Sequence, residues 1–203
     1  MDLITFEENF NDNSNNWWTG NEEIVFCDII DNRFIIEHKR DSSDYSIWKT
    51  IPMVESKAFS IEASFTFLGG YPKNGFGFLW GQKSNNGGDE SYAGFHYFVI
   101  SASGKFVVRS YNPQTKKAES IKDWTDSTFI KPGENETNVL KIMKFDDNID
   151  KQLYFLINDQ MIFQTNYLPM FGFETGFIAF QNMKIGIDFF KATFYFNENL
   201  IKQ

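Results

Sequence analysis

The feature that most constrains this chain is the alternation of large apolar residues with small or polar ones. Residues 59–67 read FSIEASFTF, and residues 75–81 read GFGFLWG, which places Phe76, Phe78 and Trp80 on one side. Successive side chains of a β-strand point to opposite faces, so this pattern is typical of strands with one face in the core.

The same kind of run recurs along the chain at the spacing of hairpins. Further strands are expected at residues 24–26, 34–37, 45–49, 93–100, 105–111, 139–145, 153–157, 161–164, 175–180 and 185–196. Asn158-Asp159 between two such runs predicts a two-residue hairpin turn, because both residue types tolerate positive φ. The one candidate for a helix is 116–123. About a dozen short strands without convincing helices predict an all-β fold, either two stacked antiparallel sheets or a closed barrel.

Length and charge narrow the functional classes. The 203 residues are expected to form one domain, 1–203, with no linker and no internal repeat. Nineteen Lys and Arg stand against 27 Asp and Glu, which gives a net charge of −8. An acidic chain without a basic run is a poor partner for nucleic acid or an anionic membrane surface. A neutral ligand, or one held by a local site, fits better.

The N-terminus and the single cysteine bear on location. Cys27 excludes an intrachain disulfide, and its apolar neighbours suggest a small buried hydrophobe. Asp2, Glu7 and Glu8 stand where a signal peptide would carry Lys or Arg. No segment approaches the ~18 apolar residues of a membrane-spanning helix. We therefore expect a cytoplasmic protein as the sequence is written, or an extracellular one if a signal has been removed.

Several stretches, taken in order, resemble a known group of proteins. They are 6–17 (FEENFNDNSNNW), 59–65 (FSIEASF), 75–81 (GFGFLWG), 97–105 (YFVISASGK), 137–142 (TNVLKI) and 153–158 (LYFLIN). Their order resembles bacterial domains of the concanavalin A-like lectin/glucanase superfamily, the jelly roll shared by laminin-G-like and DUF1080-type modules. The resemblance covers about residues 6–196 and implies an antiparallel β-sandwich. Because its motifs are structural, it implies function weakly: members include lectins, glycoside hydrolases and interaction modules.

Catalytic and metal-binding motifs are not apparent. The glucanase branch of that superfamily carries Glu-x-Asp-x-x-Glu on one strand, whereas Glu62 and Glu174 each stand without a partner carboxylate in sequence. Neither His38 nor His96 belongs to a metal-binding or triad motif. No cofactor is expected. Ca²⁺ at the acidic loops 11–16 and 146–150 is an open alternative, although neither loop has the spaced ligand pattern of a calcium site.

The candidate binding surface comes from a hairpin over residues 93–111. With a two-residue turn within 101–104, one face holds Phe95, Tyr97, Val99, Phe106 and Val108, which we expect to be the core face. The other face holds His96, Phe98, Ile100, Lys105, Val107, Arg109 and Tyr111. Sugars bind to such mixtures, since a sugar ring stacks on an aromatic ring while planar donors hold its hydroxyl groups.

Trp80 and Trp124 complete the candidate ligand-binding set with His96, Arg109 and Tyr111. A plain interpretation stays open for each residue: Arg109 could pair with a carboxylate, and Trp124 could anchor its own loop, as its place in the family pattern suggests. The first functional hypothesis is a non-catalytic carbohydrate-binding or recognition module. The alternatives are a protein-interaction or structural module without a small ligand and, third, a divergent glycoside hydrolase. The sequence leaves the ligand and the oligomeric state open.

Overall fold

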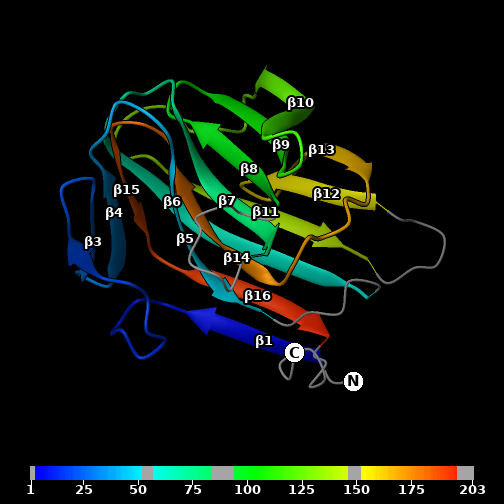
Figure 1. The fold of residues 1–203 in the computed structure, drawn as a ribbon, viewed down its shortest axis with the longest axis horizontal. Helices are drawn as coiled ribbons and strands as arrows, with labels where there is room; N and C mark the ends of the chain where they lie inside the picture. The colour runs from blue at the N-terminus through cyan, green and yellow to red at the C-terminus, as the bar shows by residue number, and fades with distance from the viewer. Residues whose placement is uncertain (1–2, 52–56, 84–93, 146–151, 196–203) are drawn as a thin grey trace.

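The computed structural model describes residues 3–51, 57–83, 94–145 and 152–195, and its regular elements there are sixteen β-strands (Figure 1). One sheet contains β5 (Tyr45–Thr50), β7 (Gly75–Gln82), β8 (Phe95–Ser101), β9 (Lys105–Asn112), β10 (Lys117–Asp126) and β14 (Glu174–Ala179). The other contains β1 (Leu3–Glu8), β2 (Gly20–Asn21), β3 (Val25–Ile30), β4 (Arg33–His38), β6 (Phe59–Gly70), β11 (Thr137–Lys144), β12 (Gln152–Ile157), β13 (Gln160–Asn166), β15 (Met183–Ile187) and β16 (Phe190–Tyr195).

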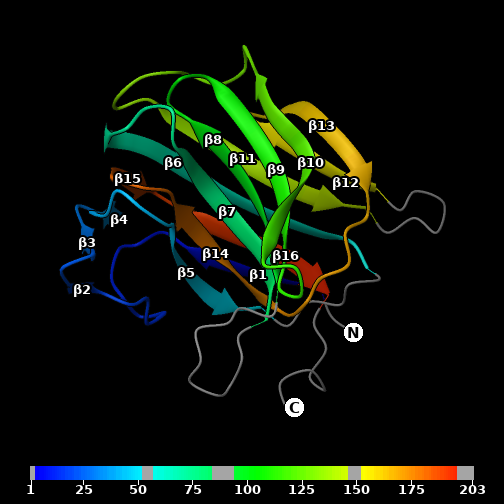
Figure 2. The ribbon, with the colours of Figure 1, turned by 45° about the horizontal axis from the view of Figure 1, so that its top comes forward.

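The two sheets are antiparallel and stack as a sandwich, which confirms the predicted fold class. The six-stranded sheet has the order β10-β9-β8-β7-β14-β5, and its strands lie side by side in Figure 2. The ten-stranded sheet has the order β13-β12-β11-β6-β15-β4-β3-β2, and β16 joins β1 to β6. Within the described residues there is no helix long and apolar enough to cross a membrane.

Aromatic side chains fill the space between the sheets. Phe65 of β6 meets Phe78 of β7 edge-on, with 5.2 Å between ring centroids. Phe98 of β8 meets Phe155 of β12 in the same way at 5.3 Å. Such edge-to-face pairs contribute about 0.5–1.5 kcal/mol each beyond the burial of their area. The high phenylalanine content of the chain is therefore used mainly to join the two layers.

The N-terminal segment is tied to this core through a buried carboxylate. Glu8 is 5% exposed and accepts hydrogen bonds from the Trp17 indole N–H at 3.0 Å and the Phe10 backbone N–H at 2.7 Å. The Trp17 ring in turn stacks on Phe177 of β14 at 5.0 Å. A buried carboxylate is tolerated here because its oxygens have donors. This network explains the FEENF…W pattern near the start of the chain.

Two local predictions have opposite outcomes. The Asn158-Asp159 turn is confirmed: both residues have positive φ, of 50° and 63°, and Ile157 pairs with Gln160 across the hairpin. The helix considered at 116–123 is wrong. Most of that segment belongs to the edge strand β10, which pairs with β9 through two register shifts. The hydrogen bonds of the segment with β9 stabilise the strand conformation more than its weak local preference stabilises a helix.

Candidate functional site

The β8–β9 hairpin turns through three residues, and this changes both of its faces. Tyr97 lies opposite Arg109 and Val99 opposite Val107, so the loop comprises 102–104. Gly104 has φ of +90°, the left-handed conformation expected at the end of a three-residue hairpin loop. The two-residue turn expected from the sequence is wrong. A slip of one residue exchanges the faces of one strand relative to its neighbour.

The prediction of which residues face the core is therefore corrected. Phe106 and Val108 lie in the core, as expected, whereas Phe95, Tyr97 and Val99 belong to a second apolar cluster, on the outer face of the six-stranded sheet. Conversely Phe98 and Ile100, placed on the outer face by the sequence, are core residues with 0% exposure. Each strand keeps its alternation, and only the relation between the two strands changes.

Trp80 and His96, two of the five candidate ligand-binding residues, lie inside the sandwich. Their exposures are 0% and 3%, and their rings pack at 5.2 Å. The His96 Nε2–H donates to the Pro169 carbonyl at 3.0 Å, and burial lowers the pKa of the imidazole. A ligand on the outer face reaches neither side chain, so the structure corrects their assignment to that surface.

The outer face of the ten-stranded sheet is polar. Lys141, Glu62, Lys191 and Glu7 lie opposite one another across β11, β6, β16 and β1. Lys141 pairs with Glu62 at 3.1 Å and Lys191 with Glu7 at 2.5 Å. Such a row of alternating charges is typical of a solvated sheet surface and contributes little to stability.

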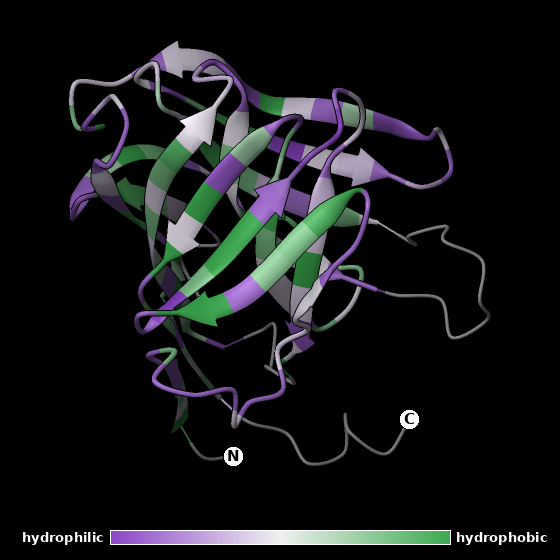
Figure 3. Ribbon diagram, turned by 90° about the vertical axis from the view of Figure 1, so that its left-hand side faces the viewer, coloured by the Kyte–Doolittle hydropathy of each residue, from purple (hydrophilic) through white to green (hydrophobic). Residues whose placement is uncertain are grey.

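The outer face of the six-stranded sheet is apolar and aromatic instead. Its middle row runs Trp48–Gly176–Leu79–Tyr97–Arg109, each residue opposite the next across β5, β14, β7, β8 and β9. Figure 3 views the side of the molecule that carries β3 and β4 of the other sheet, where apolar and polar segments also alternate along the strands. A cluster of buried residues forms the floor: Leu79, Phe95, Tyr97, Val99, Val107 and Ile178. Half-buried rings pack against this floor: Trp48, Tyr111, Trp124 and Phe180.

Arg109 and Tyr97 form a polar centre within these rings. Arg109 is half-buried and lies opposite Tyr97 across β8 and β9, where its cation acts on the Tyr97 phenol. Burial is the main cause that raises the pKa of Tyr97; the Arg109 cation opposes this rise and the nearby charge of Asp44 adds to it. At ordinary pH the phenol therefore stays protonated and able both to donate and to accept a hydrogen bond.

Asp44 adds a carboxyl group next to this centre. It stands just before β5 and is exposed to solvent, yet the surrounding protein desolvates it enough to raise its pKa. Its exposure leaves the carboxylate able to accept hydrogen bonds from a bound molecule. Together Asp44, Tyr97 and Arg109 offer an acceptor, a hydroxyl and a planar donor beside the aromatic rings.

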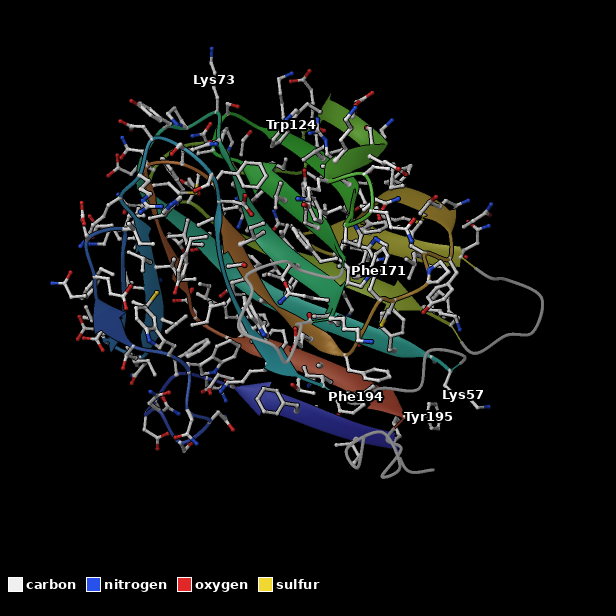
Figure 4. The ribbon with its side chains drawn as sticks, viewed as in Figure 1. Lys57, Lys73, Trp124, Phe171, Phe194 and Tyr195 are labelled. Atoms are coloured by element: carbon white, nitrogen blue, oxygen red, sulfur yellow. The ribbon has the colours of Figure 1, made fainter. Side chains whose placement is uncertain are left out.

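The remaining two candidates, Tyr111 and Trp124, join Arg109 on this surface. Tyr111 stacks on Phe95 with 5.2 Å between centroids and 20° between planes. Trp124 comes from β10 and lies on the β8–β10 side of the molecule in Figure 4, away from Tyr195 at the other end. The structure thus brings together Arg109, Tyr111 and Trp124. The sequence analysis did not assign Trp48, Tyr97 or Phe180 to this surface. To assign a residue to a face of the sheet, the pairing register of its strand must be known.

The glycines of β7 allow close packing of their neighbours. A Cβ on Gly75 would lie 2.7 Å from Cγ2 of Val99 and 3.1 Å from Cε2 of Phe180. A Cβ on Gly77 would lie 3.0 Å from Cδ1 of Leu140, in the facing sheet. The space beside these glycines is therefore filled by protein. The absence of a side chain at Gly75 allows the Phe180 ring to lie beside the aromatic floor.

A second candidate among the described residues is a polar surface pocket, whose charged side chains pair with other protein groups. A surface pocket of about 300 Å³ includes Glu37, Lys39 and Lys184 in its lining. Glu37 and Lys184 pair at 3.6 Å, and the Lys39 ammonium donates to Asn21 and to the Glu22 carbonyl. We regard the aromatic face as the better candidate because the charges of this pocket already have partners.

One of the two loops considered for Ca²⁺, 11–16, lies within the described residues. In the 11–16 loop, Asp12 accepts the Ser14 backbone N–H at 2.8 Å and Asn13 accepts that of Trp17 at 2.7 Å. These side-chain oxygens hold the loop itself. The 146–150 loop lies outside the described residues. Among the described residues no group of three or more His, Cys, Asp or Glu side chains is arranged to hold a metal ion.

Solved structures share this architecture at low sequence identity. A galectin-like protein of unknown function from Bacillus subtilis has a TM-score of 0.65 and 12% identity, over 92% of this chain and 94% of that chain. Bacillus licheniformis beta-glucanase has a TM-score of 0.62 and 7% identity, over 94% and 98%. The Emp47p carbohydrate recognition domain has a TM-score of 0.60 and 16% identity, over 95% of both chains.

These likenesses concern the fold. No protein-family model matches the sequence, and no curated relative matches it either. The matches nevertheless span almost the whole chain and include galectin-like and beta-glucanase sandwiches. This chain has the concanavalin A-like jelly-roll fold.

Proposed function

We propose that this protein is a non-catalytic carbohydrate-binding module that holds its ligand on the outer face of the six-stranded sheet. The observation that carries the proposal is the difference between the two outer faces. One has a row of paired charges from Glu7 to Lys141. The other has Tyr111 and Trp124 on the strands that flank or contain Arg109, and Trp48 at the far end of the same row. Half-buried aromatic rings with polar groups between them favour a binding site over a purely solvated face.

The chemistry of this face suits sugars. The apolar C–H face of a pyranose packs on an aromatic ring, and its hydroxyl groups need donors and acceptors at the ring edge. Trp124 and Tyr111 are half-buried rings, and Arg109 lies between β8 and β10. One of the similar solved structures is itself a carbohydrate recognition domain, which agrees with this proposal. The lack of a Glu-x-Asp-x-x-Glu strand supports the non-catalytic form.

The aromatic surface also favours a second candidate, a protein-interaction module. Aromatic residues and arginine are enriched at the centres of protein interfaces. A protein partner would bury the same rings without needing free sugar. Binding to a partner from the native host, with no binding to any glycan, would favour this candidate.

The experiment is a glycan array probed with the purified chain, with and without Ca²⁺. We expect reproducible hits with the wild type, and about tenfold weaker binding to those hits with Trp124→Ala, because a central aromatic contact is worth more than about 1 kcal/mol. The matched control is Phe145→Ala, which removes an exposed aromatic side chain next to Tyr154 on the other sheet. If both variants bind like the wild type, the site is misplaced; if no glycan binds, the carbohydrate proposal fails.

A further inference from the structure

The charge and partial burial of Arg109 bear on the class of carbohydrate that this face would bind. Arg109 is half-buried between β8 and β10, and its Nε atom is buried without a hydrogen-bond acceptor in the described part of the chain. No described carboxylate lies within ion-pairing distance of its guanidinium. Its cross-strand neighbour is Tyr97, whose hydroxyl carries no charge when protonated. A partly desolvated cation without a counter-ion is costly, and a bound anion would offset that cost.

Two of the three carboxylates of the neighbouring strand β10 are already engaged. Asp126 pairs with the Lys105 ammonium at 2.8 Å, and Asp123 accepts a hydrogen bond from the Ser120 hydroxyl at 2.6 Å. Asp44 acts on Tyr97 by its charge, but the charge that acts on its own carboxyl is that of His38. Among the described residues the guanidinium therefore has no counter-ion and is available to a ligand, although the chain as a whole carries a net charge of −8.

From this placement, and resting on the proposed carbohydrate-binding function, we infer that the preferred ligands are acidic glycans, whose carboxylate or sulfate group is held by Arg109. A guanidinium matches the two oxygens of a carboxylate with two parallel N–H groups, which a neutral hydroxyl cannot do. The rings of Trp124 and Tyr111 would stack on the sugar, and the Tyr97 hydroxyl would hold the guanidinium in place. Asp44 lies near Tyr97 and sets a limit, because it would repel an acid placed on its side of the phenol.

The test is a glycan array on which neutral glycans are printed beside their uronic acid, sialylated and sulfated counterparts. We expect the wild type to bind acidic members at least tenfold better than their neutral counterparts. With Arg109→Ala this preference should disappear, and Arg109→Lys should restore it only in part, because lysine keeps the charge and loses the fork. The uronic acid, sialylated and sulfated spots distinguish carboxylate from sulfate recognition.

The control removes a guanidinium from the other sheet. Arg33→Ala breaks a 2.6 Å ion pair with Asp188 and should leave the preference for acidic members unchanged. Equal binding of neutral and acidic members, with no effect of Arg109→Ala on their ratio, would overturn this inference and leave the proposed function standing. Binding to no glycan would instead overturn the proposed function.

Discussion

Two tryptophans show how much a single strand position decides. Trp80 has 0% exposure and packs at 5.8 Å from Phe155 of the facing sheet, whereas Trp124 is half-buried on the outer face. The sequence made both of them candidates for ligand contact: Trp80 in an alternating strand, and Trp124 between polar residues. Residue type alone could not separate them, since both environments suit an indole ring.

Replacing these two tryptophans by alanine should therefore lower the free energy of unfolding of the protein by different amounts. Trp80→Ala removes a fully buried side chain between two sheets and should lower the free energy of unfolding by about 3–5 kcal/mol. Trp124→Ala removes a half-exposed ring and should cost on the order of 1 kcal/mol. Urea denaturation followed by circular dichroism measures both.

Trp80→Phe keeps the prediction testable if Trp80→Ala does not fold, and it should retain most of the stability. Equal losses for Trp80→Ala and Trp124→Ala would contradict the assignment of Trp80 to the core and Trp124 to the outer face.

At the scale of elements, the two hairpins show where sequence reasoning reaches its limit. Asn158-Asp159 has two adjacent residues that both accept positive φ, so the pattern has one solution and the structure confirms it. The residues SASG at 101–104 allow a turn of two or of three residues. The structure uses three, with Gly104 N–H donating to the Ser101 carbonyl at 3.1 Å. Because the loop is one residue longer than predicted, Tyr97 lies on the outer face instead of in the core, and His96 is buried instead of on the outer face.

Gly104 can be tested directly. A Cβ at this position would have no heavy atom within 4 Å, so substitution brings no clash and only backbone strain at φ of +90°. Gly104→Ala should therefore lower the free energy of unfolding by about 1 kcal/mol, and Gly104→Asn by less, because asparagine tolerates positive φ better than alanine. Chemical denaturation of both variants measures this order. An alanine variant as stable as the wild type would speak against the three-residue turn.

The positions of the strands along the chain were largely predictable from the sequence. Which strands pair, and in which register, was not. The run FSIEASFTF corresponds to most of β6, and GFGFLWG corresponds to β7, because alternation marks a half-buried strand locally. The middle row of the outer face required five strands in correct register, from Trp48 to Arg109. That information is not local. Register is set by loop length and by packing across the sheets.

At the scale of the whole molecule, the sandwich has two outer faces of different character. The ten-stranded sheet presents paired charges to solvent, and the six-stranded sheet presents half-buried aromatic rings in a row that ends at Arg109. Folding alone explains the core between the sheets. It does not require the second apolar cluster, which lies on the far side of the six-stranded sheet from the core. That asymmetry is the reason for placing function on the six-stranded sheet.

The location of binding is the central claim, and chemical-shift mapping tests it most directly. The ¹⁵N-labelled chain of 23.7 kDa would be titrated with the strongest glycan hit from the array while backbone amide and tryptophan indole shifts are recorded. The account predicts the largest changes at the indole N–H groups of Trp48 and Trp124 and at the backbone of Tyr97 and Arg109, with little change along the row that includes Glu62 and Lys191. Changes concentrated on that charged row instead, with the outer face of the six-stranded sheet unmoved, would contradict it.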